Sequence, residues 1–402
     1  MDKKIMILGA SILQLPAIQK AKEMGLQVVA VDMNPEAVGF EEEGITKEVI
    51  STIDIPAVVE CAKKHGIDGV MTLASDMPMR TVAAVAKELG LVGITEETAL
   101  KATNKAYMRK ALKQGGVPIP EFYKASNREE YNAAVSNFRV AFVVKPADNS
   151  GSRGIVKIEN LTDKEAIFEA YDYSKSSSRN GDVVVEEYMN GPEVSVETLT
   201  VNGECHVIQI TDKITTGAPH FVEMGHTQPS ELDDDTKQRI AQVAILANKA
   251  VGITNGPSHT EIIVTKDGPK VVELGARLGG DCITTHLVPL STGVDMVECC
   301  IKIALGEEPD IAIKFSKGSA IRYLTCDVGK IANIAGIEEA KSLEGICQVS
   351  IIHSVGDVAS EVKNSADRVG FVVAQGKNPT DAVNICKSAI GMINITMEDV
   401  NV

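Results

Sequence analysis

The stretch from residue 258 to residue 280, S-H-T-E-I-I-V-T-K-D-G-P-K-V-V-E-L-G-A-R-L-G-G, has the pattern of a β-hairpin. Two apolar, β-branched runs flank a K-D-G sequence, and Asp-Gly between such runs is a strong signal for a hairpin turn. The first predicted strand carries Glu261 and the second carries Glu273, both among apolar residues. What this hairpin can do therefore depends on whether the two carboxylates meet.

The register of the hairpin decides this question. A two-residue Asp-Gly loop pairs Glu261 with Leu274 and puts the carboxylates on opposite faces. A three-residue Lys-Asp-Gly loop, with Gly268 in the left-handed region, pairs Glu261 with Glu273 on one face, about 5 Å apart. Carboxylates this close repel each other unless a cation lies between them, and Mg²⁺ commonly takes one or two carboxylates together with substrate phosphates. We therefore predict a magnesium–nucleotide site, with Mn²⁺ as the alternative ion; the competing interpretation is an exposed hairpin with two solvated glutamates.

The composition suits a soluble globular protein of two or three domains. The length of 402 residues exceeds that of one ordinary domain, and the hydrophobic content of 44% is enough for large cores. No apolar run approaches the ~20 residues of a membrane span, and we expect no signal peptide. The net charge of -15 argues against a nucleic-acid-binding surface. The eight cysteines show no C-x-x-C spacing, which indicates reduced, mostly buried thiols in a cytoplasmic protein.

The first 95 residues predict an open parallel α/β sheet domain. Residues 3–32 have the order strand, helix, strand, and residues 58–89 continue with helix, strand and helix before a short predicted strand at 91–94. Ser75 and Asp76 follow one of these strands. Ligands of open α/β sheets gather at such strand ends, so both residues are pocket candidates, with helix capping as an equal alternative.

Residues 96–120 predict a helical linker between domains. It ends at a double glycine and an extended V-P-I-P segment, which is typical of a domain boundary. Its basic run, which includes Lys105 and Arg109, is compatible with a solvated helix face.

Three further features follow in order. A strand at 141–146 places Lys145 among apolar residues, where a lysine needs an anion such as a nucleotide phosphate. The loop D-N-S-G-S-R-G at 148–154 would let backbone N–H groups approach an anion closely, although an ordinary hairpin loop has the same composition. The segment 182–199 predicts strand, turn and strand, with three glutamates near the turn.

These motifs, followed by the two-glutamate hairpin with Arg277, stand in an order that closely resembles the ATP-grasp superfamily, more specifically its carboxylate–amine ligases. The end of the chain resembles the C-terminal part of the L-amino-acid ligase (dipeptide synthase) branch. The resemblance implies an α/β and α+β multidomain protein, in which an N-terminal open parallel sheet precedes the ATP-grasp fold and a C-terminal subdomain. The expected parts are an α/β domain at 1–95, a linker at 96–120, a lid subdomain at 121–190, a large subdomain with the metal site at 191–310, and a C-terminal subdomain at 311–402.

The resemblance also implies roles for single residues. Those expected at the nucleotide are Lys145 and Lys105 on the phosphates, Ser150, Gly151, Ser152 and Gly154 in the covering loop, Glu186, Glu187, Tyr188 and Met189 along the adenine edge, Glu193 on the ribose, and Lys213 as a further contact. Glu261 and Glu273 correspond to the metal ligands. Arg277 corresponds to the arginine that steadies the acyl phosphate and the later tetrahedral intermediate.

One departure from the family pattern concerns the second metal strand. Many members have E-x-N-x-R there, whereas this chain has E-L-G-A-R, with Gly275 in place of the asparagine. The second metal ion would then depend on Glu273, on phosphates or on another side chain. Residues 220–230 resemble the segment that lines the amino-acid pocket, where His226 could contact substrate or relay the amine proton. Arg322 and Arg368 could reach that pocket, and their roles stay open.

We therefore expect an ADP-forming ligase that phosphorylates a carboxylate and transfers the acyl group to an amine, joining amino acids. The expected partners are ATP, Mg²⁺, a small-molecule carboxylate and a small-molecule amine, with a homodimer as the assembly and neither nucleic acid nor membrane involved. Two alternatives are a bicarbonate-activating carboxylase or carbamoyl-phosphate-synthase-like enzyme, and a catalytically silent ATP-binding regulatory protein.

Overall fold

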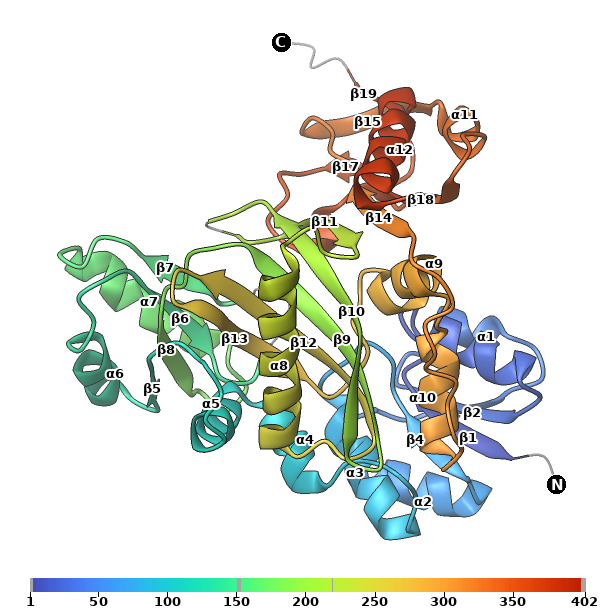
Figure 1. Cartoon of the computed structure of the whole chain (residues 1–402), viewed down its shortest axis with the longest axis horizontal. Coiled ribbons are helices and arrows are strands. Elements are labelled where there is room, and N and C mark those ends of the chain that lie inside the picture. The colour runs from blue at the N-terminus through green and yellow to red at the C-terminus, as the bar shows by residue number, and fades with distance from the viewer. Residues whose placement is uncertain (1–2, 150–152, 219, 399–402) are drawn as a thin grey trace.

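The computed structural model describes residues 3–149, 153–218 and 220–398. Ser150, Gly151 and Ser152 of the expected covering loop lie outside the described residues. Figure 1 shows four sheets, with the N-terminal sheet on one side of a large central sheet, a smaller sheet on the other side, and the C-terminal elements at one end. The predicted class, α/β and α+β with several domains, is confirmed.

The N-terminal sheet is parallel, with the strand order β3-β2-β1-β4. Its elements are β1 (Lys4–Leu8), α1 (Leu15–Glu23), β2 (Gln27–Asp32), the 3₁₀ turn η1 (Val38–Glu41), β3 (Thr46–Val49), α2 (Ile55–His65), β4 (Gly69–Met71) and α3 (Pro78–Leu89). The strand predicted at 91–94 is wrong. That segment leads directly into the next helix, and Gly93 packs closely against Ala86 of α3, so its backbone pairs with none of the described strands.

The predicted linker forms two helices, α4 (Glu96–Thr103) and α5 (Lys105–Gln114), which are separated at Asn104. Asn104 has extended backbone angles, and its side chain accepts hydrogen bonds from the backbone N–H groups of Ala106 and Tyr107. It is therefore the N-cap of α5, and it makes Lys105 the first residue of a new helix. Lys105 and Arg109 are both buried, so the interpretation of this run as a solvated face is wrong for these two residues.

The smaller sheet is antiparallel, with the order β5-β8-β6-β7, and we call it the lid sheet. Its elements are β5 (Phe122–Ala125), α6 (Arg128–Val135), β6 (Phe142–Pro146), β7 (Val156–Ile158), α7 (Lys164–Ser176) and β8 (Val183–Glu187). Its apolar core is independent of the other cores and contains stacked Phe138 and Phe142.

The large sheet has eight antiparallel strands in the order β13-β12-β9-β10-β11-β14-β18-β16. These are β9 (Glu193–Val201), β10 (Glu204–Thr215), β11 (Glu223–Gln228), β12 (Gly256–Thr265), β13 (Gly268–Gly275), β14 (Gly318–Tyr323), β16 (Ile346–Ile351) and β18 (Gly370–Gly376). The C-terminal strands β14, β18 and β16 thus extend the same sheet that contains the two-glutamate hairpin.

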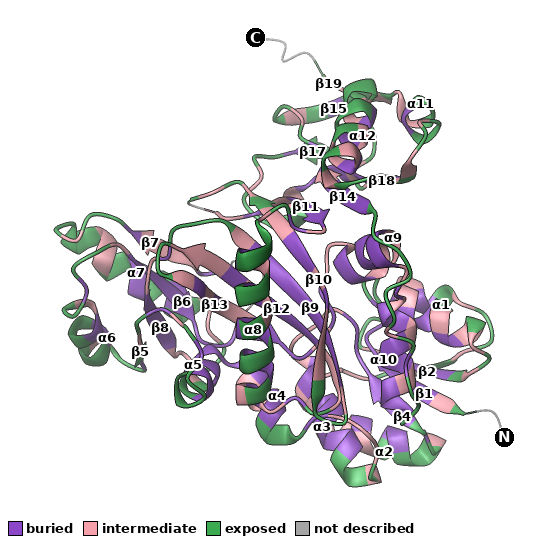
Figure 2. Ribbon diagram, in the orientation of Figure 1, coloured by how far each residue is buried: buried purple, intermediate pink, exposed green. Residues whose placement is uncertain are grey.

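Helices and a small fourth sheet complete the fold. The helices are α8 (Asp234–Val251), the π-helical turn η2 (Ile283–Leu287), α9 (Val288–Thr292), α10 (Met296–Ala304), α11 (Ile337–Lys341), the 3₁₀ turn η3 (Ser365–Asp367) and α12 (Pro379–Met392). The fourth sheet contains β15 (Gly329–Ala335), β17 (Val358–Ala359) and β19 (Asn394–Met397). In Figure 2, α8 turns an exposed face to solvent, while the strands behind it are a mixture of buried and intermediate residues. One continuous core joins the N-terminal sheet, α8 and the hairpin strands, so the N-terminal sheet is packed against the strands that carry Glu261 and Glu273.

The hairpin brings Glu261 opposite Glu273, but not by the three-residue loop that we predicted. The loop contains only Lys266 and Asp267, because Thr265 already pairs with Gly268. Between the pairs Ile262–Val271 and Glu261–Glu273 the register shifts by one residue, so that Val272 is extra. This β-bulge restores the pairing that the shorter loop alone would have lost, and it places the two glutamates on neighbouring positions of one face.

Candidate active site

Each hairpin glutamate is paired with a buried lysine from another part of the chain. Lys105 Nζ lies 2.7 Å from Glu273 Oε1, and it also donates to the carbonyl oxygen of Asn149 on the lid side. Lys213 Nζ lies 2.8 Å from Glu261 Oε1. The two expected metal ligands and two of the expected nucleotide lysines are therefore brought together.

Lys213 lies at the centre of three carboxylates. Its Nζ is 2.7 Å from Glu193, 2.8 Å from Glu261 and 3.3 Å from Glu223. Burial alone would lower the pKa of Lys213, but the three glutamates outweigh burial and raise it well above its ordinary value. Burial would likewise raise the pKa of Glu261, yet Lys213 and His259 hold it well below its ordinary value. Lys213 thus links the residue expected at the ribose to one expected at the metal.

Glu197 and His259 extend this centre into the sheet. Glu197 is fully buried on β9, where its Oε1 is 2.8 Å from His259 Nδ1, and His259 Nε2 is 3.7 Å from Glu261 Oε1. Burial lowers the pKa of His259, but the charge and hydrogen bond of Glu197 outweigh it and raise the pKa to about 9. His259 is therefore protonated at neutral pH and adds a positive charge beside Glu261. Neither His259 nor Glu197 was among the predicted site residues. The two-residue spacing of Glu197 from Ser195 and its four-residue spacing from Glu193 nevertheless put these three residues on one strand face.

A second buried network joins the lid sheet to the bulge. Arg109, which is 1% exposed, donates to both carboxylate oxygens of Glu186, at 2.6 and 3.0 Å. The same guanidinium donates to the carbonyl oxygens of Val271 and Val272 at the bulge, at 2.9 and 2.7 Å. Lys145 Nζ is 2.9 Å from Glu186. Burial would raise the pKa of Glu186, but Arg109 and Lys145 lower it to about 2. The sequence predicted that buried Lys145 needs an anion, and in this structure the carboxylate of Glu186 is that anion.

Arg277 is paired with Asp76, one of the two strand-end candidates of the N-terminal domain. Arg277 Nε lies 2.7 Å from Asp76 Oδ1; burial would lower the pKa of the guanidinium, but the charge and hydrogen bond of Asp76 outweigh burial and raise it. A Cβ atom at Gly275 would lie 3.0 Å from Asp76 Oδ1 and 3.1 Å from Arg277 Nε. The Asp76–Arg277 pair thus occupies the space that an asparagine side chain at residue 275 would need. The other candidate, Ser75, accepts a hydrogen bond from Gln14.

The expected substrate side contains a buried histidine without a hydrogen-bond partner. His226 is 1% exposed, and among the described residues neither ring nitrogen has a hydrogen-bond partner; its Nε2 lies 3.6 Å from Asp281 Oδ2. Arg368 donates to both oxygens of Asp281, at 2.7 and 3.0 Å. Arg322 donates to the carbonyl oxygen of His226 and to Thr227. His226 Nε2 therefore faces the carboxylate of Asp281, which Arg368 holds.

The residues expected along the adenine edge have mixed environments. Glu187 Oε2 lies 3.5 Å from Lys270 Nζ, and the ammonium group of Lys157 lies over the ring of Tyr188. The backbone N–H of Tyr188 already donates to Ala141, while Met189 is buried. Gly154, from the covering loop, has a φ of 78° and packs against Ser177, where a larger residue would collide.

The donor chemistry of the centre fits a hard divalent cation. Two carboxylates face each other across neighbouring strands, and oxygen ligands of this kind suit Mg²⁺ and related ions. In this structure the ammonium groups of Lys105 and Lys213 neutralise the two carboxylates, as a bound cation would. The geometry thus supports a site where a metal ion and an anionic ligand bind together.

Comparisons with known proteins agree with this architecture. The ATP-grasp domain family matches residues 138–285, and the L-amino acid ligase C-terminal domain 2 family matches residues 322–398. An L-arginine-specific L-amino acid ligase of Bacillus subtilis is 28% identical over 283 residues, 69% of this chain and 68% of that protein. A phosphoribosylamine–glycine ligase of Methanococcus maripaludis is 25% identical over 406 residues, 93% of this chain and 89% of that protein. A solved L-amino acid ligase of Bacillus licheniformis has a TM-score of 0.86 at 23% identity, with 99% of each chain covered.

Fold and site together define an ATP-grasp enzyme, a class that binds ATP with a divalent metal ion. The chain contains an ATP-grasp domain at residues 138–285 and the L-amino acid ligase C-terminal domain 2 at residues 322–398, and the relatives named above are ligases. The alternatives of bicarbonate activation and of a silent regulatory protein are not favoured, because the named relatives are ligases of this kind. No helix in the described part of the chain is long and apolar enough to cross a membrane.

Proposed function

We propose that the protein phosphorylates the carboxylate of an amino acid with Mg-ATP and passes the acyl group to the amino group of a second amino acid, releasing ADP and phosphate. The observation that carries this proposal is the pair Glu261–Glu273, each neutralised by a lysine, with Arg277 two residues beyond the hairpin strand. The L-arginine-specific relative supports amino acids as the substrate class.

Glu261 and Glu273 would hold the metal ion. When bound, Mg²⁺ neutralises the phosphate oxygens and orients the transferring phosphoryl group. Gly275 offers no ligand, so the second ion would rely on Glu273 and on phosphate oxygens. Mn²⁺, which also accepts carboxylate oxygens, would substitute for Mg²⁺.

The cationic side chains would bind the nucleotide phosphates. Lys105, which contacts Glu273 of the hairpin, and Lys145, which contacts Glu186 of the lid sheet, would exchange these carboxylate partners for phosphates. The further proposed contacts are Glu193 with the ribose, Lys213 beside it, the segment Glu186, Glu187, Tyr188 and Met189 with the adenine, and the covering loop Ser150, Gly151, Ser152 and Gly154 with the phosphates.

Arg277 would act on the reacting carboxylate. Negative charge builds up on the acyl phosphate and on the tetrahedral intermediate, and a fixed guanidinium stabilises that charge without reorganising. Asp76 holds Arg277 in position. His226, buried and without a hydrogen-bond partner among the described residues, would contact the substrate or relay the proton that the attacking amine loses.

The experiment is to measure ADP release with Mg-ATP against pairs of amino acids, and separately with bicarbonate. We expect ADP to form only when an acceptable carboxylate is present, and hydroxylamine to replace the amine and yield a hydroxamate. ADP with bicarbonate alone would move the enzyme to the carboxylase branch. Measurable ATP binding without ADP in any mixture would contradict the enzyme proposal.

A variant pair checks the metal assignment. Glu273→Gln should lower turnover by about 100-fold or more, because a charged ligand is lost where transition-state charge develops, while the circular dichroism spectrum stays unchanged. The matched control is Glu204→Gln, on β10 with an exposed side chain. Retained activity in Glu273→Gln would show that Glu273 is no metal ligand. The proposed homodimer is checked separately by light scattering.

A further inference from the structure

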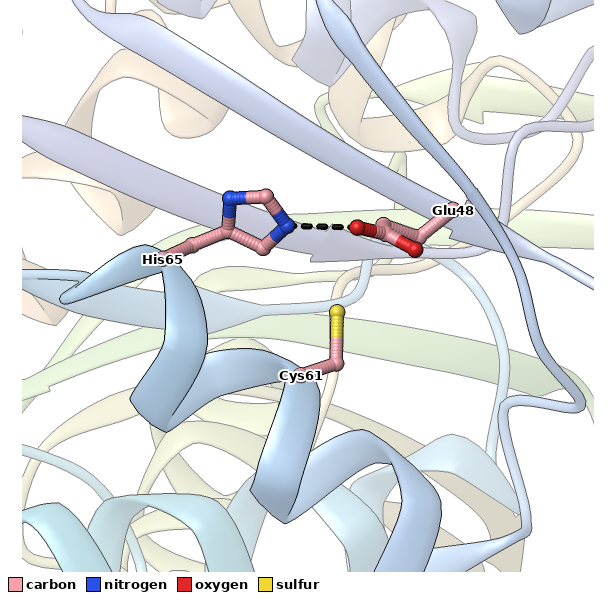
Figure 3. A group of neighbouring side chains, drawn as sticks. All are labelled: Glu48, Cys61 and His65. Carbon is pink, nitrogen blue, oxygen red and sulfur yellow. Dashed lines mark hydrogen bonds and ion pairs between the residues drawn. The ribbon is translucent and has the colours of Figure 1, made fainter.

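A cluster of three metal-ligating side chains lies in the N-terminal domain, outside the site described above. Figure 3 shows Glu48 from β3 and Cys61 and His65 from α2, with their polar ends directed toward one another. Cys61 and His65 are four residues apart, so they lie on one face of the helix, one turn from each other. Glu48 approaches from the neighbouring edge strand.

The ligand atoms are close enough to share one ion. His65 Nε2 is 2.6 Å from Glu48 Oε1, and the three atoms Glu48 O, Cys61 Sγ and the His65 ring nitrogen lie within 4.8 Å of one another. Cys61 is only 6% exposed, and its sulfur points at the gap between the other two side chains in Figure 3. Nothing in the ligase chemistry uses these residues.

The ligand types select the kind of cation. A thiolate, an imidazole and a carboxylate together suit Zn²⁺, whose bonds to such atoms are about 2.0–2.3 Å long in a tetrahedral site, whereas Mg²⁺ prefers oxygen alone. A tetrahedral site needs these ligand atoms somewhat farther apart than the present contact between His65 and Glu48. Side-chain rotation of Glu48 on its edge strand can supply that opening. Three protein ligands would leave the fourth position to water.

The competing explanation is an ordinary hydrogen-bonded pair on the protein surface. Lys64 Nζ also lies 2.9 Å from Glu48 Oε1, and its side chain is 67% exposed, so it can leave when a cation arrives. A His–Glu pair has no need of a thiol, however, and the inward-facing Cys61 is what distinguishes the cluster from such a pair.

We propose that Glu48, Cys61 and His65 form a binding site for a Zn²⁺-type divalent cation, which fastens the edge strand β3 to helix α2. β3 has four residues, most of them exposed, so few apolar contacts hold it in place. A bound ion would replace those missing contacts by direct bonds between the strand and the helix. The site is separate from the Glu261–Glu273 centre and independent of the proposed function.

Cobalt provides the test, because Co²⁺ replaces Zn²⁺ and reports its ligands in its absorption spectrum. The full chain, freed of metal by a chelator, is titrated with CoCl₂. We expect one Co²⁺ ion per chain to show a thiolate-to-cobalt charge-transfer band and the intense visible bands of a tetrahedral ion. Cobalt at Glu261 and Glu273 cannot give the thiolate band, because no described cysteine belongs to that centre.

Two variants decide the outcome. Cys61→Ser should lose the charge-transfer band and bind Co²⁺ at least about tenfold more weakly, since even outer-sphere changes cost that much at metal sites. Cys347→Ser, at an exposed cysteine elsewhere, should behave as the unaltered protein does. Zn²⁺ should raise the melting temperature of the unaltered protein more than that of Cys61→Ser, which keeps the Glu261–Glu273 centre. No thiolate band, or the same band in Cys61→Ser, would overturn the proposal.

Discussion

Arg109 shows how much one buried side chain can organise. Its guanidinium binds Glu186 on the lid sheet and the two carbonyl groups at the bulge beside Glu273. It thereby connects the strand that carries Glu273 to the sheet that carries Lys145. Its contribution is positional, because its hydrogen-bonding groups are already directed at protein atoms.

We expect Arg109→Met to lower the free energy of unfolding by about 3–5 kcal/mol, because it leaves a buried carboxylate with one cation instead of two and frees two carbonyl groups. Urea denaturation followed by circular dichroism measures this change. Lys110→Met is the matched control, since Lys110 is the next residue of the same helix and is exposed; its effect should stay within about 0.5 kcal/mol. Equal effects of the two variants would contradict the role of Arg109.

The residues of the candidate site could be predicted from sequence only where a chemical type and a motif coincide. Glu261, Glu273 and Lys105 were predicted in this way, and they meet in the structure. Arg109 was missed because periodicity does not tell which face of a polar helix is buried. Its spacing of four residues from Lys105 was the available signal, since both then share one face.

Gly275 gives a second test at this scale. A side chain there would meet the Asp76–Arg277 pair at about 3 Å, so Gly275→Asn should disturb Arg277 and lower kcat, although it restores the usual family residue. Gly275→Ala adds only the Cβ atom and should have a smaller effect. Steady-state kinetics of both variants measure this effect. A rise in kcat for Gly275→Asn would contradict the expectation, because it would show that an asparagine fits beside the Asp76–Arg277 pair.

At the scale of elements, the hairpin reached the expected pairing by an unexpected route. The sequence indicated a hairpin and limited the register to a few choices. It could not indicate the bulge, because Val271 and Val272 are the same residue type and nothing local marks which of them is extra. Arg109, from a distant helix, holds both of their carbonyl groups, so the bulge is stabilised by long-range contacts.

The break between α4 and α5 at Asn104 positions Lys105 next to Glu273. Asn104→Ala removes the cap of α5 and should cost about 1 kcal/mol of stability, while Asn104→Asp should retain most of it. Because Lys105 is the first residue after the cap, we also expect a higher KM for ATP in Asn104→Ala. Denaturation and ATP-dependent kinetics check these expectations; an unchanged KM in a destabilised variant would show that the cap does not position Lys105.

At the scale of the whole molecule, three sheets with their helices contribute to one centre. The N-terminal part supplies Asp76, the lid sheet supplies Lys145 and Glu186, and the large sheet supplies the strands that carry Glu261 and Glu273. The order of these parts could be predicted from the motifs. The joining of β14, β18 and β16 to the same large sheet could not, because pairing between strands far apart in sequence leaves no local pattern.

This arrangement predicts that metal and nucleotide bind cooperatively. Without nucleotide, Lys105 and Lys213 neutralise Glu273 and Glu261, so a cation must displace them. Phosphates would accept the lysines and release the carboxylates. We expect Mn²⁺ to bind about tenfold more tightly when ADP is present, and by reciprocity ADP to bind equally more tightly with Mn²⁺. Electron paramagnetic resonance of free Mn²⁺ measures this coupling, which Lys105→Met should reduce; equal Mn²⁺ affinity with and without ADP would contradict it.

The most direct test of carboxylate activation follows an oxygen atom. If the enzyme phosphorylates an amino-acid carboxylate, one carboxylate oxygen becomes the bridge of the acyl phosphate and leaves with the phosphate when the amine attacks. With a substrate whose carboxylate is labelled with oxygen-18, mass spectrometry should find one labelled oxygen in each phosphate released during ligation. Phosphate without label, or label found in AMP, would contradict the proposed reaction.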